Sequence, residues 1–163
     1  MQRTGQKIIN VIGAPATGKT TLRRALAKAT GLPSYGIDDE RIRLLRPGRW
    51  WPEDDRQSWR NLWQRIGDQD CIVETCNPIE HSASLLTVRC MAAQGARRVR
   101  LGMRVGSGYR LAQGRRNYIE QLMRVSDPAS GDCEWDGTKP HGLDGLLSAV
   151  ETFLKGRAGR EVG

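Results

Sequence analysis

Short apolar runs alternate with segments of helical periodicity along this chain, and each change of period predicts a change of secondary structure. The run KIINVI (Lys7–Ile12) is apolar and ends at a glycine turn, as a buried strand does. From Gly18 to Thr30 the apolar residues recur at helical spacing, and Gly31-Leu32-Pro33 follows as a stop signal. The beginning of the chain therefore predicts a strand, a glycine turn and a helix.

The rest of the chain continues this order of strands and helices. Further strands are expected at Ser34–Ile37, Asp70–Thr75 and Arg97–Val105, and further helices at Asp38–Leu45, Arg56–Gly67, Ile79–Ala93, Ser107–Arg124 and Gly142–Leu154. Loops are expected at Arg46–Asp55 and Val125–Pro140. Such alternation predicts an α/β fold, with a parallel sheet and helices on both of its faces. Without an internal repeat or a linker, residues 1–155 are expected to form a single domain, followed by a polar tail at 156–163.

The glycine turn after the first strand reads GAPATGKT (Gly13–Thr20) and satisfies G-x-x-x-x-G-K-[ST] in full. Between a strand and a helix, such a P-loop cradles phosphates with its backbone N–H groups and the helix dipole. Lys19 is expected to bridge the β- and γ-phosphates of ATP, and the Thr20 hydroxyl to ligate Mg²⁺. The predicted nucleotide-binding residues are Gly13, Ala14, Pro15, Ala16, Thr17, Gly18, Lys19, Thr20 and Thr21, together with Arg110 further along.

Other features separate a kinase from the remaining nucleotide-binding classes. The chain has neither an NKxD-like guanine motif nor a DxxG switch, both of which a GTPase needs, and it is short for a helicase or motor. From Arg97 to Arg124 there are eight arginines and one acid. An arginine-rich helical segment at 106–124 suits the lid that small phosphotransferases close over the phosphates. Arg115 and Arg116 are the catalytic candidates on this lid, and a solvated helix face is the alternative.

The segment GIDDER (Gly36–Arg41) follows the second predicted strand. It resembles the D-D-x-R segment of phage polynucleotide kinase and its P-loop relatives, which include zeta toxins and chloramphenicol phosphotransferases. The resemblance implies a nucleoside-kinase-like P-loop NTPase fold, with Asp38 as the base for the acceptor hydroxyl and Arg41 as a clamp for a substrate phosphate. Asp38 also falls where open α/β sheets bind ligands. The alternatives are a helix N-cap for Asp38 and a solvated helix face for Arg41.

A second acid, Glu74, ends the third predicted strand in CIVET. The resemblance implies a residue for Mg²⁺ or for substrate at this point, although many relatives carry aspartate there. Glu74 is therefore a candidate for both metal binding and substrate binding, and a purely structural role is the alternative.

The acceptor is expected beside a tryptophan-rich segment at residues 46–68. Trp59 and Trp63 lie on the apolar stripe of a predicted helix, which favours core packing. Trp50 and Trp51 lie in a loop, where indoles can stack on the bases of a substrate or can plug the loop onto the domain. The neighbouring arginines Arg46, Arg49, Arg56 and Arg60 and a net charge of +8 suit a polyanion. The alternative is that arginine is simply the favoured cation of this chain, which has 21 arginines against 5 lysines.

Three functions remain open at this point. The first is an ATP-dependent kinase that acts on a nucleic acid and would modify DNA. Its acceptor would be a polynucleotide 5′-hydroxyl or a hydroxymethylated base such as 5-hydroxymethyluracil in phage DNA. The second is a small-molecule kinase acting on a nucleoside, antibiotic or nucleotide-sugar. The third is a non-catalytic ATP-binding module.

Composition excludes several other classes. The four cysteines form no CxxC pair and there are two histidines, which argues against zinc and favours reduced thiols in the cytoplasm. No apolar run approaches the roughly 18 residues of a membrane helix, and the first residues lack a signal-peptide core. No stable protein partner is evident from the sequence.

Overall fold

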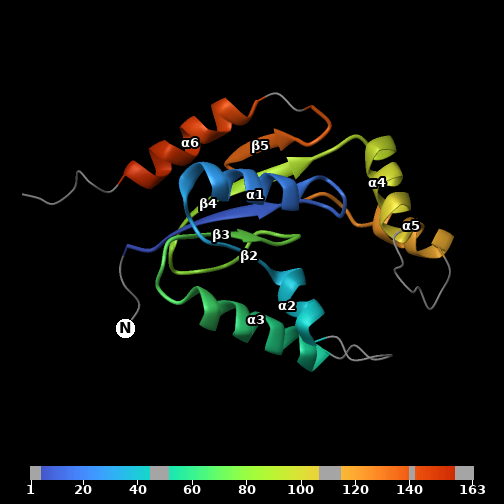
Figure 1. The fold of residues 1–163 in the computed structure, drawn as a ribbon, viewed down its shortest axis with the longest axis horizontal. Coiled ribbons are helices and arrows are strands. Elements are labelled where there is room, and N and C mark those ends of the chain that lie inside the picture. Colours follow the sequence, from blue (N-terminus) through green and yellow to red (C-terminus); the bar gives the residue numbers. More distant parts are fainter. Residues whose placement is uncertain (1–4, 45–51, 107–114, 140–141, 157–163) are drawn as a thin grey trace, which may run out of the picture.

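The computed structural model describes residues 5–44, 52–106, 115–139 and 142–156. Within these ranges a five-stranded parallel sheet forms the centre of the molecule (Figure 1). Its strands are β1 (Lys7–Ile12), β2 (Ser34–Gly36), β3 (Cys71–Glu74), β4 (Ser84–Met91) and β5 (Cys133–Asp136). The order across the sheet is β2-β3-β1-β4-β5, so the chain crosses over β1 between β3 and β4.

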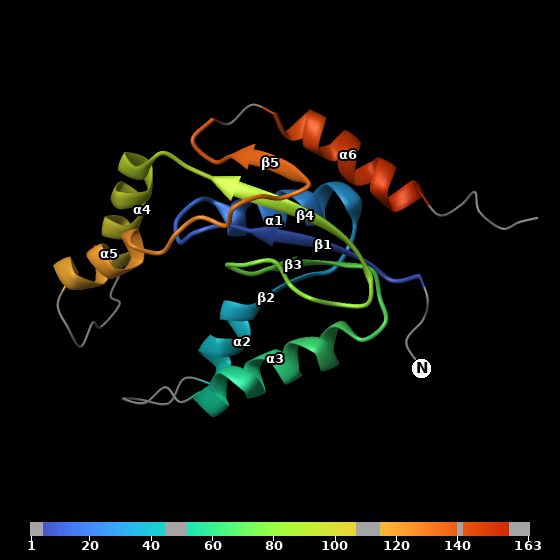
Figure 2. The ribbon, with the colours of Figure 1, turned by 180° about the vertical axis from the view of Figure 1, so that it is seen from behind.

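Helices lie on both faces of this sheet, which confirms the predicted α/β fold class (Figures 1 and 2). They are α1 (Lys19–Thr30), α2 (Ile37–Leu44), α3 (Pro52–Ile66), α4 (Gln94–Gly106), α5 (Arg115–Met123) and α6 (Leu143–Lys155). On one face α1 and α6 pack against β1 through Leu22, Leu26 and Val150. On the other face α3 packs through Leu62 and Ile66. None of the helices in the described ranges is long and apolar enough to cross a membrane.

The central strand β1 explains where a ligand can bind. All six of its residues are buried, because both faces of the strand are covered and both edges are paired. After β1 the chain continues to β2 and β3, which lie on one side of β1 in the sheet. It then crosses to β4 and β5, which lie on the other side of β1. Such a reversal opens a crevice at the carboxyl ends of the strands. The P-loop, which follows β1 directly, therefore lies at the expected ligand-binding edge.

Two predicted elements were assigned to the wrong secondary structure. The predicted helix at 79–93 is instead a loop at 79–83 followed by strand β4, and the predicted strand at 97–105 lies within helix α4. Along β4 the apolar run is compatible with either structure, and pairing with β1 from Lys7↔Ser84 to Ile12↔Arg89 decides for a strand. In α4 arginines alternate with apolar residues, which imitates a strand period.

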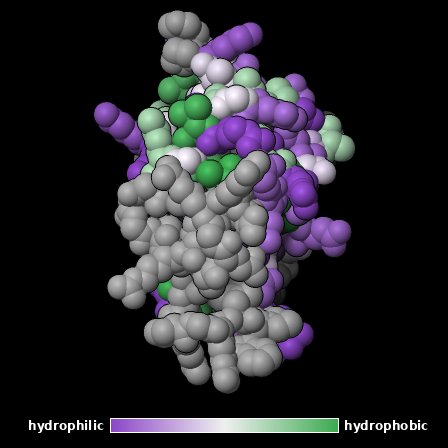
Figure 3. Space-filling model, turned by 90° about the vertical axis from the view of Figure 1, so that its right-hand side faces the viewer, coloured by the Kyte–Doolittle hydropathy of each residue, from purple (hydrophilic) through white to green (hydrophobic). Residues whose placement is uncertain are grey.

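The helical period of α4 is seen in the burial of its side chains. Arg97 and Leu101, one turn apart, are buried, whereas Val99 and Met103 are exposed. Seen from the α4–α5 end, hydrophobic side chains reach the surface among hydrophilic ones (Figure 3). The helix therefore turns an arginine inward and leaves part of its apolar side in solvent.

Two predicted loops contain regular secondary structure. Strand β5 lies inside the predicted loop at 125–140. The sequence pattern did not predict it, because the short charged sequence CEWD becomes a strand only by pairing with the edge of β4. Helix α3 begins at Pro52 and not at Arg56. Proline suits the first helical position, and the acids Glu53, Asp54 and Asp55 in the first turn suit the helix dipole.

Candidate active site

The P-loop lies between β1 and α1, as the sequence predicts, and two of its glycines are required by geometry. A Cβ atom at Gly13 would lie 2.5 Å from the carbonyl oxygen of Cys90. Gly18 caps α1 in the left-handed conformation, with φ of 99°. A larger residue at either point would push the loop away from the sheet or strain its backbone. The loop therefore keeps its close approach to β4 and leads directly into the N-terminus of α1, as a phosphate site requires.

Lys19 is folded over this loop. Its side chain donates a hydrogen bond from Nζ to the carbonyl oxygen of Ala14 at 2.9 Å, and the residue is only 7% exposed. The Thr17 hydroxyl donates to the same carbonyl at 2.9 Å. The loop thus holds an ammonium group against its own backbone, where a phosphate oxygen could replace the carbonyl as its partner.

Thr20 and Glu74, the two predicted metal ligands, lie together. The Thr20 hydroxyl donates to Glu74 Oε1 at 2.8 Å. Arg23 lies on the far side of Glu74, with Nε 3.1 Å from Oε2, and its NH1 donates to Asp39 Oδ2 at 2.9 Å. Gly36 leaves room for this arginine, since a Cβ atom there would lie 2.5 Å from NH1. Arg23 and Asp39 were missed by the sequence analysis, because their pairing joins α1 to α2 across the end of the sheet.

The donor set fits Mg²⁺ rather than a metal held by protein alone. A hydroxyl and a carboxylate are hard oxygen ligands, and Mg²⁺ binds through few protein groups plus phosphates and waters. In the described part of the chain, no group of three or more acidic, histidine or cysteine side chains could hold a metal ion. Thr20 and Glu74 are thus the protein groups that could hold Mg²⁺ beside a nucleotide.

Asp38 and Arg41 contact each other on α2. Arg41 donates from NH1 to Asp38 Oδ1 at 2.9 Å and from Nε to Asp55 Oδ1 at 2.8 Å. Burial lowers the pKa of Arg41, but the hydrogen bonds to the two carboxylates outweigh burial and raise it above its usual value. Asp38 is 66% exposed and lies inside the first turn of α2, after Ile37. The geometry therefore places a solvent-accessible carboxylate beside an arginine that two acids orient.

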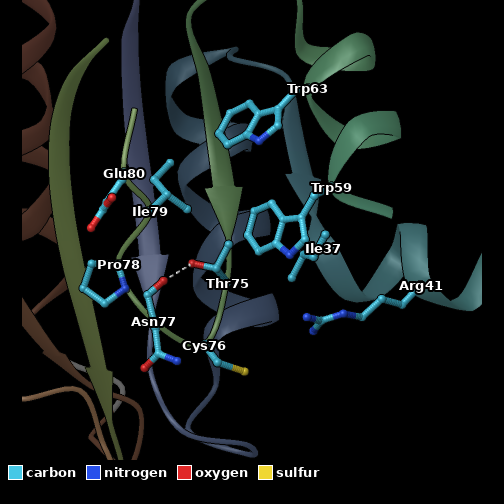
Figure 4. A pocket seen from close by; sticks show the side chains of 10 residues that line it. All are labelled: Ile37, Arg41, Trp59, Trp63, Thr75, Cys76, Asn77, Pro78, Ile79 and Glu80. Carbon is cyan, nitrogen blue, oxygen red and sulfur yellow. Dashed lines mark hydrogen bonds between the residues drawn. The ribbon is translucent and has the colours of Figure 1, made fainter. Parts of the chain in front are cut away.

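A pocket of about 310 Å³ opens beside Arg41, between α2, α3 and the chain segment after β3 (Figure 4). Its lining residues are Ile37, Arg41, Trp59, Trp63, Thr75, Cys76, Asn77, Pro78, Ile79 and Glu80. Trp59 and Trp63 pack against the core, as predicted, and also line the pocket. Trp63 stacks with Trp59, at 6.2 Å between ring centroids, and with His81, at 4.6 Å.

The pocket and the P-loop share a wall. The Gly13 N–H donates to the carbonyl oxygen of Cys76 at 3.2 Å, and the Thr75 N–H donates to Val11 at 3.0 Å. Thr75 and Cys76 both belong to the connection from β3 to β4 at residues 75–83. The structure describes all of this connection, and it contains no helix. A group bound in the pocket would therefore lie next to phosphates in the loop.

Asn10, in the middle of β1, holds this connection in place. Its fully buried amide donates to Val73 O at 3.1 Å and to the Thr75 hydroxyl at 2.9 Å, and its Oδ1 accepts from the Ile79 N–H at 3.0 Å. The only sequence signal for this role is a polar residue inside the apolar run KIINVI. A buried amide requires hydrogen-bond partners, but the sequence does not reveal which ones.

The other predicted site residues lie beyond what the structure describes. Trp50, Trp51 and Arg110 fall outside the described ranges. Arg115 and Arg116 begin α5, and only their backbone is described. Their predicted roles stay predictions.

Comparison with known proteins supports the fold. No protein-family model and no curated protein sequence matches the chain. A crystal structure from Chloroflexus aurantiacus, named a "putative kinase", is 20% identical, with a TM-score of 0.70 over 94% of this chain and 98% of that one. A gluconokinase from Sinorhizobium meliloti is 17% identical, with a TM-score of 0.52 over 96% and 93% of the two chains.

A third similar structure belongs to the Pnkp1/Rnl/Hen1 RNA repair complex. It is 15% identical, with a TM-score of 0.54 over 74% of this chain and 45% of that one. Likeness at such identities concerns the fold, which is that of an α/β P-loop NTPase and is shared with proteins named as kinases. The narrower resemblance to polynucleotide kinase, zeta toxins and chloramphenicol phosphotransferases stays a prediction.

Proposed function

We propose that this protein is an ATP-dependent kinase that transfers the γ-phosphate to a hydroxyl group bound in the pocket beside Arg41. The observation that supports it most is the shared wall: the Gly13 N–H of the P-loop donates to Cys76, which lines the pocket. A nucleotide on the loop and an acceptor in the pocket would thus be neighbours, as direct phosphoryl transfer requires. Two of the proteins with a similar fold are named as kinases, which agrees with this activity.

On the nucleotide side, the backbone of residues 13–21 and the N-terminus of α1 would bind the phosphates of ATP. Lys19 would exchange the Ala14 carbonyl for a phosphate oxygen, and Thr20 and Glu74 would hold Mg²⁺. Bound Mg²⁺ supplies neutralisation of charge on the transferring phosphoryl group. Further positive charge would come from a lid at 106–124, through Arg110, Arg115 and Arg116. This lid would be part of a single domain at 1–155, with residues 156–163 as a tail outside the domain.

On the acceptor side, Asp38 would take the proton from the acceptor hydroxyl. The acceptor oxygen then forms a bond to the γ-phosphorus while the bond from that phosphorus to the bridging oxygen breaks, and ADP leaves. Arg41, oriented by Asp38 and Asp55, would hold the acceptor near this carboxylate. Its exposed position gives Asp38 access to an incoming hydroxyl.

The pocket favours an uncharged acceptor group that is no larger than about a nucleoside. Its volume is near the lower limit of small-molecule sites, and two indoles line it. Arg41 is already paired with two carboxylates, and Glu80 adds negative charge to the lining. A sugar acid would therefore gain little electrostatic attraction from the described lining residues.

A nucleic-acid acceptor, which the sequence favours, agrees with this pocket if a single nucleotide enters it. One terminal nucleoside or one flipped-out hydroxymethylated base of DNA would suit the volume. The basic charge on α3 supports this acceptor less than expected, because Arg56 and Arg60 pair with Glu53 at 2.5 and 3.8 Å. A small-molecule kinase acting on a nucleoside is therefore the second candidate.

The test is transfer of label from γ-labelled ATP with Mg²⁺ to a panel of acceptors. The panel contains nucleosides, gluconate, single-stranded DNA with a free 5′-hydroxyl, and duplex DNA with and without hydroxymethyluracil. Label is expected on a nucleoside group, either free or within a strand, and not on gluconate. Tight ATP binding without transfer to any acceptor would instead support a non-catalytic ATP-binding module.

A further inference from the structure

The P-loop contains a backbone conformation that its sequence does not favour. Ala16 has φ of 64°, in the left-handed region, and it is the single non-glycine residue with positive φ among those that the structure describes. Glycine occupies this region without a steric penalty, whereas the Cβ atom of alanine makes it unfavourable. Ala16 is also almost fully buried. Contacts around it must therefore hold this residue in place.

Those contacts come from α4. Arg100 donates from NH1 to the carbonyl oxygen of Ala16 at 3.1 Å and from NH2 to the carbonyl oxygen of Gly137 at 2.7 Å. Its NH1 also lies 3.7 Å from the point where a Cβ atom of Gly18 would be. One guanidinium thus joins the left-handed residue of the P-loop to the turn that follows β5.

The turn after β5 fits closely against the same part of the loop. A Cβ atom at Gly137 would lie 2.1 Å from the carbonyl oxygen of Thr17, so that only glycine permits this approach. Arg97, one turn before Leu101 on α4, donates from Nε to the carbonyl oxygen of Pro15 at 3.0 Å. The carbonyls of Pro15 and Ala16 therefore accept hydrogen bonds from α4, and the next carbonyl, that of Thr17, lies against the turn after β5.

We propose that Arg100 is a positioning residue that holds Ala16 in the left-handed conformation and so preforms the phosphate-binding loop. When a loop turns its N–H groups toward an anion, carbonyls on its outer side need partners of their own. The planar fork of arginine reaches the carbonyls of Ala16 and Gly137 at once, which the single ammonium of lysine does less well. Without this fork, Ala16 relaxes out of the left-handed region and the loop binds phosphate less tightly.

This inference rests on the proposed nucleotide binding, and a cycle of substitutions tests it through ATP affinity. The dissociation constant of ATP with Mg²⁺ is measured by calorimetry for the wild type, Arg100→Gln, Ala16→Gly and the double variant. Arg100→Gln is expected to weaken binding about tenfold, the scale of a lost charge-assisted hydrogen bond. Ala16→Gly removes the steric penalty, so the double variant should bind at least about threefold more tightly than Arg100→Gln alone.

Two further variants separate geometry from charge. Arg100→Lys keeps the positive charge and should resemble Arg100→Gln. Arg98→Gln removes one arginine from the same helix, at an exposed position paired with Glu120, and should bind ATP as the wild type does. Equal effects of Arg100→Gln with alanine or glycine at position 16 would overturn the proposal, because Arg100 would then act on the nucleotide directly.

A second measurement needs no nucleotide. The three-bond coupling between the amide and α protons of Ala16, measured by NMR, reports its φ angle in the free protein. Arg100→Gln should shift this coupling away from the left-handed value, and Arg98→Gln should not. An unchanged coupling in Arg100→Gln also overturns the proposal. Failure of the wild type to bind ATP, with the coupling shifted as expected, would reject the proposed function and leave the role of Arg100 intact.

Discussion

At the scale of single residues, the charged side chains of the site are already committed to partners. In the DDER segment, Asp38 pairs with Arg41, Asp39 with Arg23, and Glu40 with Arg65. Arg23 and Glu40 are buried, so removing the partner of either leaves a buried charge without compensation, which lowers stability for reasons unrelated to chemistry. Substitutions at this site are therefore most informative when they preserve shape and change only charge.

Lys19→Ala should reduce phosphoryl transfer by about 10²-fold or more, since an electrostatic group that acts on the transferring phosphate is lost. The fold should remain, because Thr17 still donates to the Ala14 carbonyl. The measurement is the initial rate of label transfer, with circular dichroism as the check on folding. Lys28→Ala, at an exposed position of the same helix, is the matched control. Near-normal transfer by folded Lys19→Ala would refute the assigned role of the P-loop.

Asp38→Asn should lower kcat by about 10²-fold, the usual scale of general-base catalysis, with little change in the KM for ATP. The amide keeps the size of the side chain and an oxygen for Arg41, so folding should be unaffected. Steady-state rates at saturating ATP provide the measurement, and Asp39→Asn is the comparison at the neighbouring carboxylate. A large loss of kcat in Asp39→Asn, with a normal kcat in Asp38→Asn, would assign the role of general base to Asp39.

At the scale of elements, the connection from β3 to β4 forms one wall of the pocket beside Arg41. It has to cross over β1, and residues 75–83 do so without a helix. Buried hydrogen bonds to Asn10, together with packing of Ile79 in the core, take the place of helical hydrogen bonds. The position of the pocket wall therefore depends on one amide in the middle of the central strand.

Asn10→Leu should lower the free energy of unfolding by about 2 kcal/mol, because the buried N–H of Ile79 loses its acceptor. It should also raise the KM for the acceptor more than the KM for ATP, since the displaced connection lines the pocket. Urea unfolding and steady-state kinetics measure the two effects. Thr87→Val, at the position paired with Asn10 on β4, is the control. An unchanged acceptor KM in Asn10→Leu would show that the connection does not position the acceptor.

At the scale of the whole molecule, the net charge of +8 bears on the choice between acceptor classes. Nucleic-acid binding releases counterions and weakens steeply with salt, whereas binding of a neutral nucleoside does not. If the acceptor is a DNA strand, its KM should rise at least about tenfold between 50 and 200 mM salt. Trp50→Ala and Trp51→Ala should raise it further, by loss of stacking. A salt-independent KM that neither variant changes would favour the small-molecule acceptor.

The buried thiols give the protein a predictable weakness at alkaline pH. Burial raises the pKa of both Cys71 and Cys90 to about 12. The unfolded thiols ionise near pH 9, so between about pH 9 and 12 the unfolded state binds fewer protons and stability falls as pH rises. Urea midpoints at pH 8 and pH 10 should show this decline, and it should be smaller in Cys71→Ala/Cys90→Ala. An equal decline in that variant would assign the effect to other groups.

The sequence by itself determined the features that lie in contiguous residues. The P-loop between β1 and α1, the acid at the end of β3 and the helices α1 and α6 all follow from local motifs and periodicity. A loop motif carries its geometry in its own glycines, and an amphipathic helix carries its period within a few turns. These elements were enough to predict the α/β fold class and the phosphate-binding side of the candidate site.

Tertiary structure alone decided the elements and contacts that depend on distant partners. The apolar run of β4 became a strand because β1 has an open edge for it, and CEWD became β5 because β4 then offers the next edge. The pairing of Arg23 with Glu74 and Asp39, and the bonds of Asn10, join residues that the sequence separates. Sheet pairing and buried polar contacts gain their free energy between segments, so no local pattern records them.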